Sequence, residues 1–101
     1  MGKLNMSNRY SILMEMDHCL YCGRKHVLHI HEIFNGANRK LSIKYGLCVS
    51  LCPQHHNMSN DSAHLNREKE LELKEWGQRE CMKHYNMSKE EFIKIFGKSY
   101  I

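Results

Sequence analysis

Polar and apolar residues alternate with period two along residues 26–34. One set points to one side, the other to the opposite side: Val27, His29, His31 and Ile33 against Leu28, Ile30, Glu32 and Phe34. This alternation predicts a β-strand. Asn35-Gly36 is a turn signal, and residues 46–51 (GLCVSL) predict a short second strand. Two short strands joined by a connection therefore form the first half of the predicted fold.

Helical patterns dominate the second half of the chain. From about Asp61 to Tyr85 the pattern is helical, with Glu70–Lys74 and Glu75–Arg79 in the favourable i,i+4 order. The charges along this segment are expected on a solvated helix face. The run from Ser88 to Glu91 is a capping box. It predicts a short helix over residues 92–96 that Gly97 ends.

The remaining segments are less regular. Residues 38–45 (NRKLSIKY) are basic and fit either a loop or a short helix. Pro53 stands where a helix can begin, and residues 57–62 form a polar insertion. Residues 1–17 are polar and methionine-rich, and we expect an N-terminal arm, either a short lead-in strand or a loosely ordered segment.

Length and composition define the class of protein. The 101 residues suffice for one small domain, here 18–101 with a C-terminal helical extension. The predicted fold class is α+β, and chains this short often need a metal or disulfide staple. Five cysteines, an odd number, fit a metal in a reducing compartment better than a disulfide framework. Without an apolar run long enough for a signal peptide or a membrane span, we expect a cytoplasmic protein with no membrane partner.

Two half-sites in the first half of the chain have zinc-ligand spacing. Cys19 and Cys22 are separated by two residues, and so are Cys52 and His55. Zinc prefers thiolate and imidazole ligands in a tetrahedron, so these four side chains predict one structural Zn²⁺. The alternative is buried or redox-active thiols. Cys48 and Cys81 lack partners at ligand spacing and are both expected in the core, with Cys48 at most a weak rival to Cys52.

A second group of metal-capable residues remains once the zinc ligands are assigned: His29, His31, Glu32, His56 and His64. His31 and Glu32 are adjacent, on opposite faces of the predicted strand. His56 directly follows the fourth zinc ligand, at the start of the presumed helix. A strand histidine and a helix-start histidine, both fixed by the zinc, can converge on one cation. His29 lies on the same face as His31 and can replace it.

These residues carry a family resemblance. The segment HEIFNGANRKLSIKYGLCVSLCPQHHN and the tail FIKIFGKSYI resemble small phage and prophage HNH (ββα-metal) endonucleases, in the zinc-stapled form related to recombination-enhancement nucleases. The likeness covers about residues 17–101. It implies a ββα-metal core with a pair of zinc knuckles and C-terminal helices. It also implies that His31 and His56 bind a catalytic divalent ion, that His64 completes this site, and that Glu32 is the general base.

The function implied by the resemblance is metal-dependent hydrolysis of DNA phosphodiester bonds, as an endonuclease or nickase. One Mg²⁺, Mn²⁺, Ni²⁺ or Zn²⁺ is expected at the catalytic site. DNA is the expected partner, with recombination or phage replication proteins implied beside it. Arg39, Lys40 and Lys44 are expected to contact phosphates rather than bases.

Two other functions stay open. The family usually has histidine where this chain has Glu32, so a zinc-stapled DNA-binding module without turnover is the alternative. A protein-interaction adaptor that uses the charged helix is a third interpretation.

Overall fold

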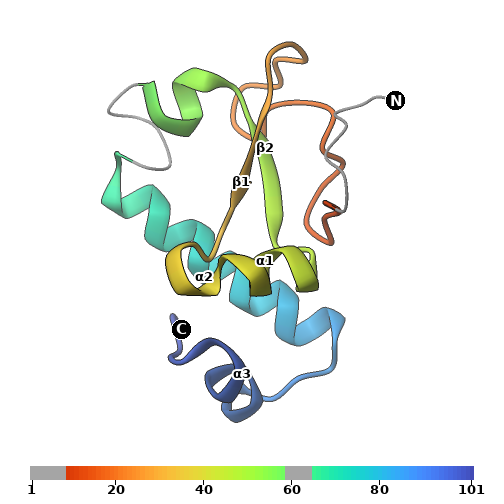
Figure 1. The fold of residues 1–101 in the computed structure, drawn as a ribbon, viewed down its shortest axis with the longest axis vertical. Coiled ribbons are helices and arrows are strands. Elements are labelled where there is room, and N and C mark those ends of the chain that lie inside the picture. Colours follow the sequence, from red (N-terminus) through yellow and green to blue (C-terminus); the bar gives the residue numbers. More distant parts are fainter. Residues whose placement is uncertain (1–8, 59–64) are drawn as a thin grey trace.

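A computed structural model of the chain describes residues 9–58 and 65–101. It is a small mixed structure of helices and one two-stranded sheet (Figure 1). The elements in chain order are β1 (His29–Glu32), the 3₁₀-helix η1 (Gly36–Asn38), α1 (Arg39–Tyr45), β2 (Cys48–Leu51), the π-helix η2 (Gln54–Met58), α2 (Arg67–His84) and α3 (Lys89–Phe96). This mixture of helices and strands agrees with the predicted α+β class, with α1 between the two strands.

The sheet is an antiparallel pair whose register gives each face a different character. His29 lies opposite Leu51 and His31 opposite Val49, so these four side chains share one face. Ile30, Glu32, Cys48 and Ser50 share the other face. The structure thus places His31 and Glu32 on opposite sides of the strand, as the alternation predicted.

The first strand is shorter than the nine alternating residues that predicted it. Val27 has a φ of 54°, a left-handed conformation that a β-strand cannot contain. At the other end, the N–H of Phe34 donates to Ser42 Oγ, and the Ser42 hydroxyl donates to the Phe34 carbonyl. The ladder therefore ends where Phe34 turns into the core, with its ring 5.0 Å from that of Phe96.

Residues 38–45 form a helix rather than a loop, and its end receives the N-terminal segment. The helix α1 stops at Gly46, which has a φ of 73°. A Cβ at this position would lie 2.5 Å from a ring carbon of Tyr10. Glycine is therefore required here for its backbone conformation and for the close approach of Tyr10.

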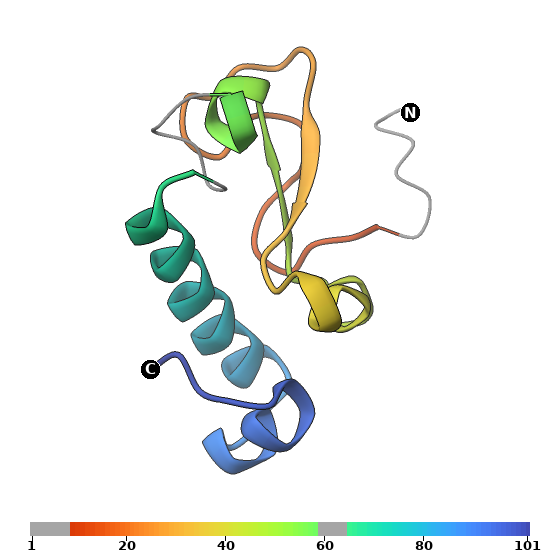
Figure 2. The same ribbon diagram turned by 60° about the vertical axis from the view of Figure 1, so that its left-hand side comes forward.

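The long helix α2 packs along the face of the hairpin that carries Val49 and Leu51 (Figure 2). Its Leu73 and Cys81 join the buried cluster. A Cβ at Gly77 would lie 3.2 Å from Ile33 Cγ2, which shows how closely helix and hairpin approach. The helix begins after Asn66, whose side chain accepts from the Lys69 N–H. Most of the predicted start, residues 61–64, lies outside the described residues.

The predicted capping box is confirmed. Ser88 accepts from the Glu91 N–H, while the Glu91 carboxylate accepts from the Ser88 N–H. Gly97, with a φ of 97°, ends α3 as expected. The predicted Glu70–Lys74 pair is also present, with 3.4 Å between Glu70 Oε2 and Lys74 Nζ.

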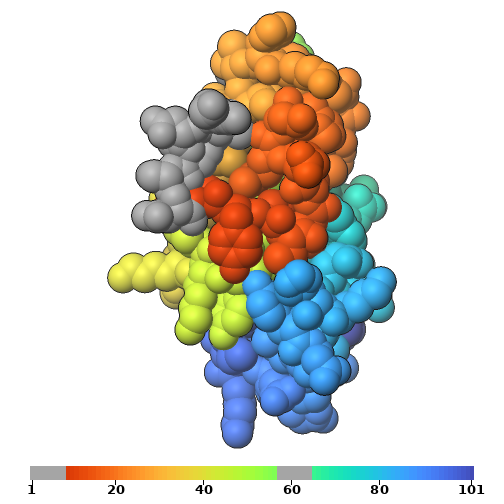
Figure 3. All heavy atoms as spheres, turned by 90° about the vertical axis from the view of Figure 1, so that its right-hand side faces the viewer, coloured from red at the N-terminus to blue at the C-terminus, as the bar shows by residue number. Residues whose placement is uncertain are grey.

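Residues 9–18 form an irregular segment held against the face of the sheet that carries Glu32. Ser11 Oγ donates to the Cys48 carbonyl, and Ser50 Oγ donates to the His18 carbonyl. The segment runs beside β2 (Figure 1) and lies against the end of α1 on the surface (Figure 3). The structure thus shows a packed coil in this part of the arm, where the sequence left open a strand or a loose segment.

In the part of the chain that the structure describes, no helix combines the length and the apolar character needed to cross a bilayer.

Candidate metal centre and imidazole cluster

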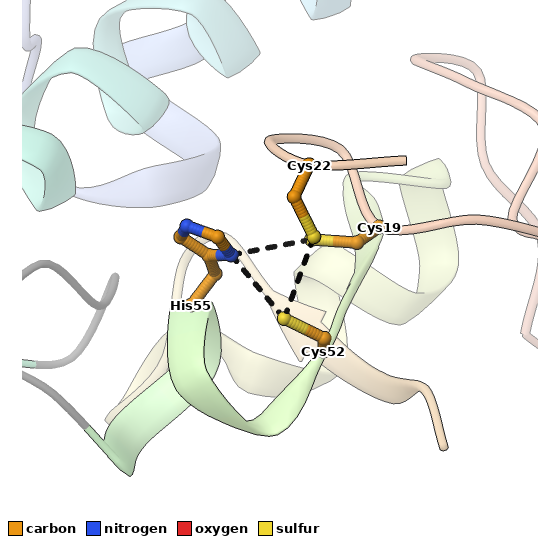
Figure 4. A group of neighbouring side chains, drawn as sticks. All are labelled: Cys19, Cys22, Cys52 and His55. Carbon is orange, nitrogen blue, oxygen red and sulfur yellow. Dashed lines mark hydrogen bonds between the residues drawn. The ribbon is translucent and has the colours of Figure 1, made fainter. Parts of the chain in front are cut away.

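The four predicted zinc ligands come together from two loops. Cys19 and Cys22 lie in the turn before β1, where Gly23 N–H donates to the Cys19 carbonyl. Cys52 directly follows β2, and His55 lies in η2. The His55 N–H donates back to the Cys52 carbonyl. The side chains point toward a common centre (Figure 4), and their ligand atoms all lie within 4.8 Å of one another.

The separations in this Cys₃His group match a tetrahedral metal site. Two thiolates on one Zn²⁺, each at about 2.3 Å, are about 3.8 Å apart, and a thiolate and an imidazole nitrogen about 3.6 Å apart. Here Cys22 Sγ is 3.7 Å from Cys52 Sγ. His55 Nδ1 is 3.7 Å from Cys19 Sγ and 3.2 Å from Cys52 Sγ. These sulfurs are too far apart for a disulfide of about 2.05 Å, so the donor set fits zinc.

The thiols differ in acidity, and the two cysteines of the turn before β1 shift in opposite directions. A backbone hydrogen bond at Arg24 acts to lower the pKa of Cys22, but burial and the neighbouring thiols of Cys19 and Cys52 outweigh it and raise the pKa. Burial works to raise the pKa of Cys19, but hydrogen bonds from surrounding backbone N–H groups outweigh it and lower the pKa to about 6. A thiolate is the form that binds metal. Burial instead raises the pKa of Cys48 to about 12 and that of Cys81 to about 11. These two are buried core thiols, as the sequence predicted, and Cys48 is not part of the metal group.

A second cluster consists of imidazoles from β1 and η2. His29 Nδ1 and His56 Nδ1 share a hydrogen bond of 3.0 Å. The His31 ring centroid lies 5.4 Å from that of His56, and His31 is buried. His29, which the sequence offered only as a substitute for His31, thus hydrogen-bonds to His56, and His31 contacts His56 ring to ring. We call His29, His31 and His56 the imidazole cluster.

The imidazole cluster lies next to the Cys₃His group along the chain. His56 is the residue after His55, and its N–H donates to the Cys52 carbonyl. His29 and His31 lie on the same face of β1, opposite Leu51 and Val49. The short connection through Cys52, which directly follows β2, therefore sets the spacing between the histidines of the sheet and the histidine of η2. His64, the further predicted ligand, lies outside the described residues.

Glu32 is placed away from this cluster. Its carboxylate faces the N-terminal segment, where Arg9 Nε donates to Oε2 at 3.3 Å. Arg39 Nε lies 3.6 Å from the other oxygen, Oε1. Both oxygens of the predicted general base therefore face guanidinium groups.

The predicted phosphate-contacting residues are all exposed on α1: Arg39, Lys40 and Lys44. Arg39 reaches Glu32, and Lys44 lies over the Tyr45 ring. The structure adds Arg9 to this basic region, a residue that sequence reasoning passed over. A lone arginine in a polar arm gives no periodic signal that would reveal its partner 23 residues later.

Together, fold and site define a small mixed helix and strand protein with a Cys₃His group able to bind zinc. Comparison with protein-family models, with curated proteins and with solved structures finds no match for this chain.

Proposed function

We propose that this protein is a metal-dependent endonuclease of HNH type that cleaves or nicks DNA, with the β1–β2 hairpin and η2 as its ββα-metal core. The observation that carries the proposal is the 3.0 Å contact between His29 Nδ1 and His56 Nδ1 beside the Cys₃His group. Two imidazoles from different elements are brought together at a place that the zinc ligands fix. A purely structural staple does not require this second cluster.

The imidazole cluster fits a hydrated divalent ion. Two ligands at about 2.1 Å in neighbouring octahedral positions are about 3.0 Å apart, the separation of the two Nδ1 atoms. Few protein ligands leave positions open for water and substrate, which distinguishes a catalytic site from a closed structural one. A bound ion would act as a Lewis acid on the phosphoryl oxygens and the leaving oxygen.

We propose that the basic side chains of α1 bind the phosphodiester backbone. Exposed Arg39, Lys40 and Lys44 place three cations on one short helix next to the hairpin. Contacts of this type position the nucleic acid and carry no sequence information. We therefore propose that α1 holds the backbone while the imidazole cluster holds the ion.

The resemblance assigns Glu32 as the base that accepts a proton from water. In the structure its oxygens face Arg9 and Arg39, on the opposite face of β1 from His31. As a base it would have to give up these arginine contacts. The proposal of cleavage therefore rests on the imidazole cluster and not on Glu32.

The contacts of Glu32 with Arg9 and Arg39 favour a second candidate function, a DNA-binding module without turnover. In that case the Cys₃His group and the basic helix serve binding alone, and Glu32 anchors arginines.

Plasmid nicking separates the two candidates. The protein is dialysed against EDTA under conditions that leave one zinc per chain, confirmed by metal analysis, and incubated with supercoiled plasmid and Mg²⁺, Mn²⁺, Ni²⁺ or Zn²⁺. An endonuclease converts the plasmid to open or linear forms with at least one ion and stops when the ion is removed again. Absence of cleavage with every ion, in protein that binds the plasmid, would refute the nuclease.

Glu32 variants in the same assay test the base. Glu32→Gln keeps the shape and removes the basic carboxylate, so a true base loses on the order of 10²-fold in rate. Glu32→His restores the usual family residue and should retain or raise the rate at saturating protein, where weaker binding of the plasmid no longer limits cleavage. An inactive native protein together with an active Glu32→His would identify a binding module on a nuclease scaffold.

A further inference from the structure

We propose that Arg9 and Arg39, aligned by Glu32, form a fork that binds a backbone phosphate of the nucleic acid. The inference rests on the proposed function for the identity of the ligand, and it adds the N-terminal segment to the contact surface. Arg9 and Glu32 take roles that the sequence did not assign to them. In this site Glu32 is a positioning residue, because it acts through the two guanidinium groups.

The geometry of the contacts carries the proposal. Arg9 Nε reaches Glu32 Oε2 at 3.3 Å, and Arg39 Nε lies 3.6 Å from Oε1. One carboxylate thus meets two arginines, each through its Nε. A guanidinium has five N–H donors in a planar fork. A carboxylate at the Nε edge faces the Nε–H and the terminal N–H beside it, which leaves the other three N–H donors of each arginine directed elsewhere.

Burial and charge indicate that the remaining N–H donors of the two arginines can bind an anion. The Glu32 side chain is 16% exposed, Arg9 22% and Arg39 55%. A partly buried carboxylate needs one cation to compensate it. The second arginine leaves a net positive charge at the surface, next to exposed Lys40 and Lys44. A pair of arginine forks suits the bidentate geometry of a phosphate.

The N-terminal segment holds Arg9 in place before any ligand arrives. Ser11 Oγ donates to the Cys48 carbonyl at 2.6 Å, and the Ile12 N–H donates to the Gly46 carbonyl at 2.9 Å. The Tyr10 ring fills the space over Gly46. Because the backbone on its C-terminal side is anchored to the sheet, Arg9 loses less freedom when it binds a phosphate.

The fork is also placed well for the proposed cleavage site. Glu32 directly follows His31 in β1, so the fork and the imidazole cluster lie on the two faces of one strand. The sheet has two strands, and β1 pairs with β2 along one edge. His31 is buried on the face that α2 covers, so a phosphodiester chain that runs along the other edge of β1 would meet the arginines on one side and the partly exposed His29 and His56 on the other.

Direct binding tests the fork without any need for cleavage. A labelled 20-bp DNA duplex is titrated with the zinc-loaded protein, without added divalent ion, at several salt concentrations, and fluorescence anisotropy gives Kd. Arg9→Gln and Arg39→Gln should each raise Kd about 10-fold and lower the salt slope by about one. Arg79→Gln, an exposed arginine on α2, is the matched control and should stay within about 2-fold of native.

A double-mutant cycle tests the positioning role of Glu32. If Glu32 aligns Arg9, then Arg9→Gln should raise Kd less than about 3-fold when Glu32→Gln is already present. Equal effects of Arg9→Gln in the two backgrounds would overturn the positioning role. A merely structural effect would lower the melting temperature without this coupling in Kd.

The remaining outcomes separate this inference from the proposed function. Arg9→Lys keeps the positive charge and the ion pair with Glu32. A lysine ammonium, however, lacks the planar guanidinium that can bind Glu32 on one side and a phosphate on another, so DNA binding should weaken about 3-fold. Native-like binding by both Arg9→Lys and Arg9→Gln, in a protein that binds and nicks DNA, overturns the fork and leaves the nuclease standing. A native protein that binds no DNA overturns both.

Discussion

The Cys₃His group and the imidazole cluster lie side by side, yet their donors differ in kind and in number. The first has three sulfurs and one nitrogen, all within 4.8 Å of one another, with Cys19 and Cys52 buried. The second brings two imidazole nitrogens to 3.0 Å, with a third ring close by. Both use consecutive histidines of η2, His55 for the first and His56 for the second.

Under the proposed function, this difference separates a role in folding from a role in chemistry. Four thiolate and imidazole ligands saturate a tetrahedral ion and leave no position for substrate. Two or three imidazoles leave positions open. In a chain this small, a saturated site can supply folding free energy, and it also fixes the residues of the open site. Predictions about the two clusters should therefore separate stability from activity.

The largest effect is expected for Cys22→Ser. Cys22 is exposed, and an exposed substitution with no special role changes stability by about 0.5 kcal/mol or less. Loss of a zinc ligand instead removes a large part of a binding free energy of about 10–16 kcal/mol, which is comparable to the whole stability of a domain. We expect an unfolded chain by circular dichroism and no bound zinc by metal analysis.

A chelator provides the control for this prediction. Strong chelation should bring the native chain to the state of Cys22→Ser, and should change the variant little further. A Cys22→Ser protein that melts like native protein and has no zinc would remove the folding role from the Cys₃His group.

His56→Ala should have the opposite profile. His56 is partly buried and lies outside the Cys₃His group, so zinc content and DNA binding should stay near native. Plasmid nicking should fall by on the order of 10²-fold or more, because the ion loses a ligand. His26→Ala, an exposed histidine in the turn before β1, is the matched control and should cleave as native protein does. Unfolding of His56→Ala would show that the two clusters do not divide stability from activity.

The smallest effect is expected for Ser88→Ala. It removes the side-chain acceptor for the Glu91 N–H at the start of α3, and loss of such a cap costs about 1 kcal/mol. Chemical denaturation should show this decrease, with zinc content and nicking unchanged. The variant thus measures how much a modest loss of stability alone affects cleavage. A large fall in nicking by Ser88→Ala would weaken the interpretation of every other variant.

Local patterns determined the parts of the fold that depend on neighbouring residues. The spacing of Cys19, Cys22, Cys52 and His55 was enough to predict their convergence, because one metal ion can satisfy only ligands that meet. The capping box at Ser88 and the end of α3 at Gly97 were also predicted, since both depend on residues three to four positions apart. The period-two pattern correctly placed His31 and Glu32 on opposite faces.

Contacts between distant residues decided the rest. The alternating pattern could not show that β1 ends at Glu32, because Ser42, eight residues beyond Phe34, binds both polar groups of the Phe34 backbone. The pattern could not show that His29 as well as His31 contacts His56, since both lie on one face and these contacts depend on the path of η2. The pattern also could not predict the contact between Arg9 and Glu32, because that contact depends on how residues 9–18 pack against β2. Sequence by itself determined which residues can bind a metal, and tertiary packing decided which of the remaining charges and imidazoles meet.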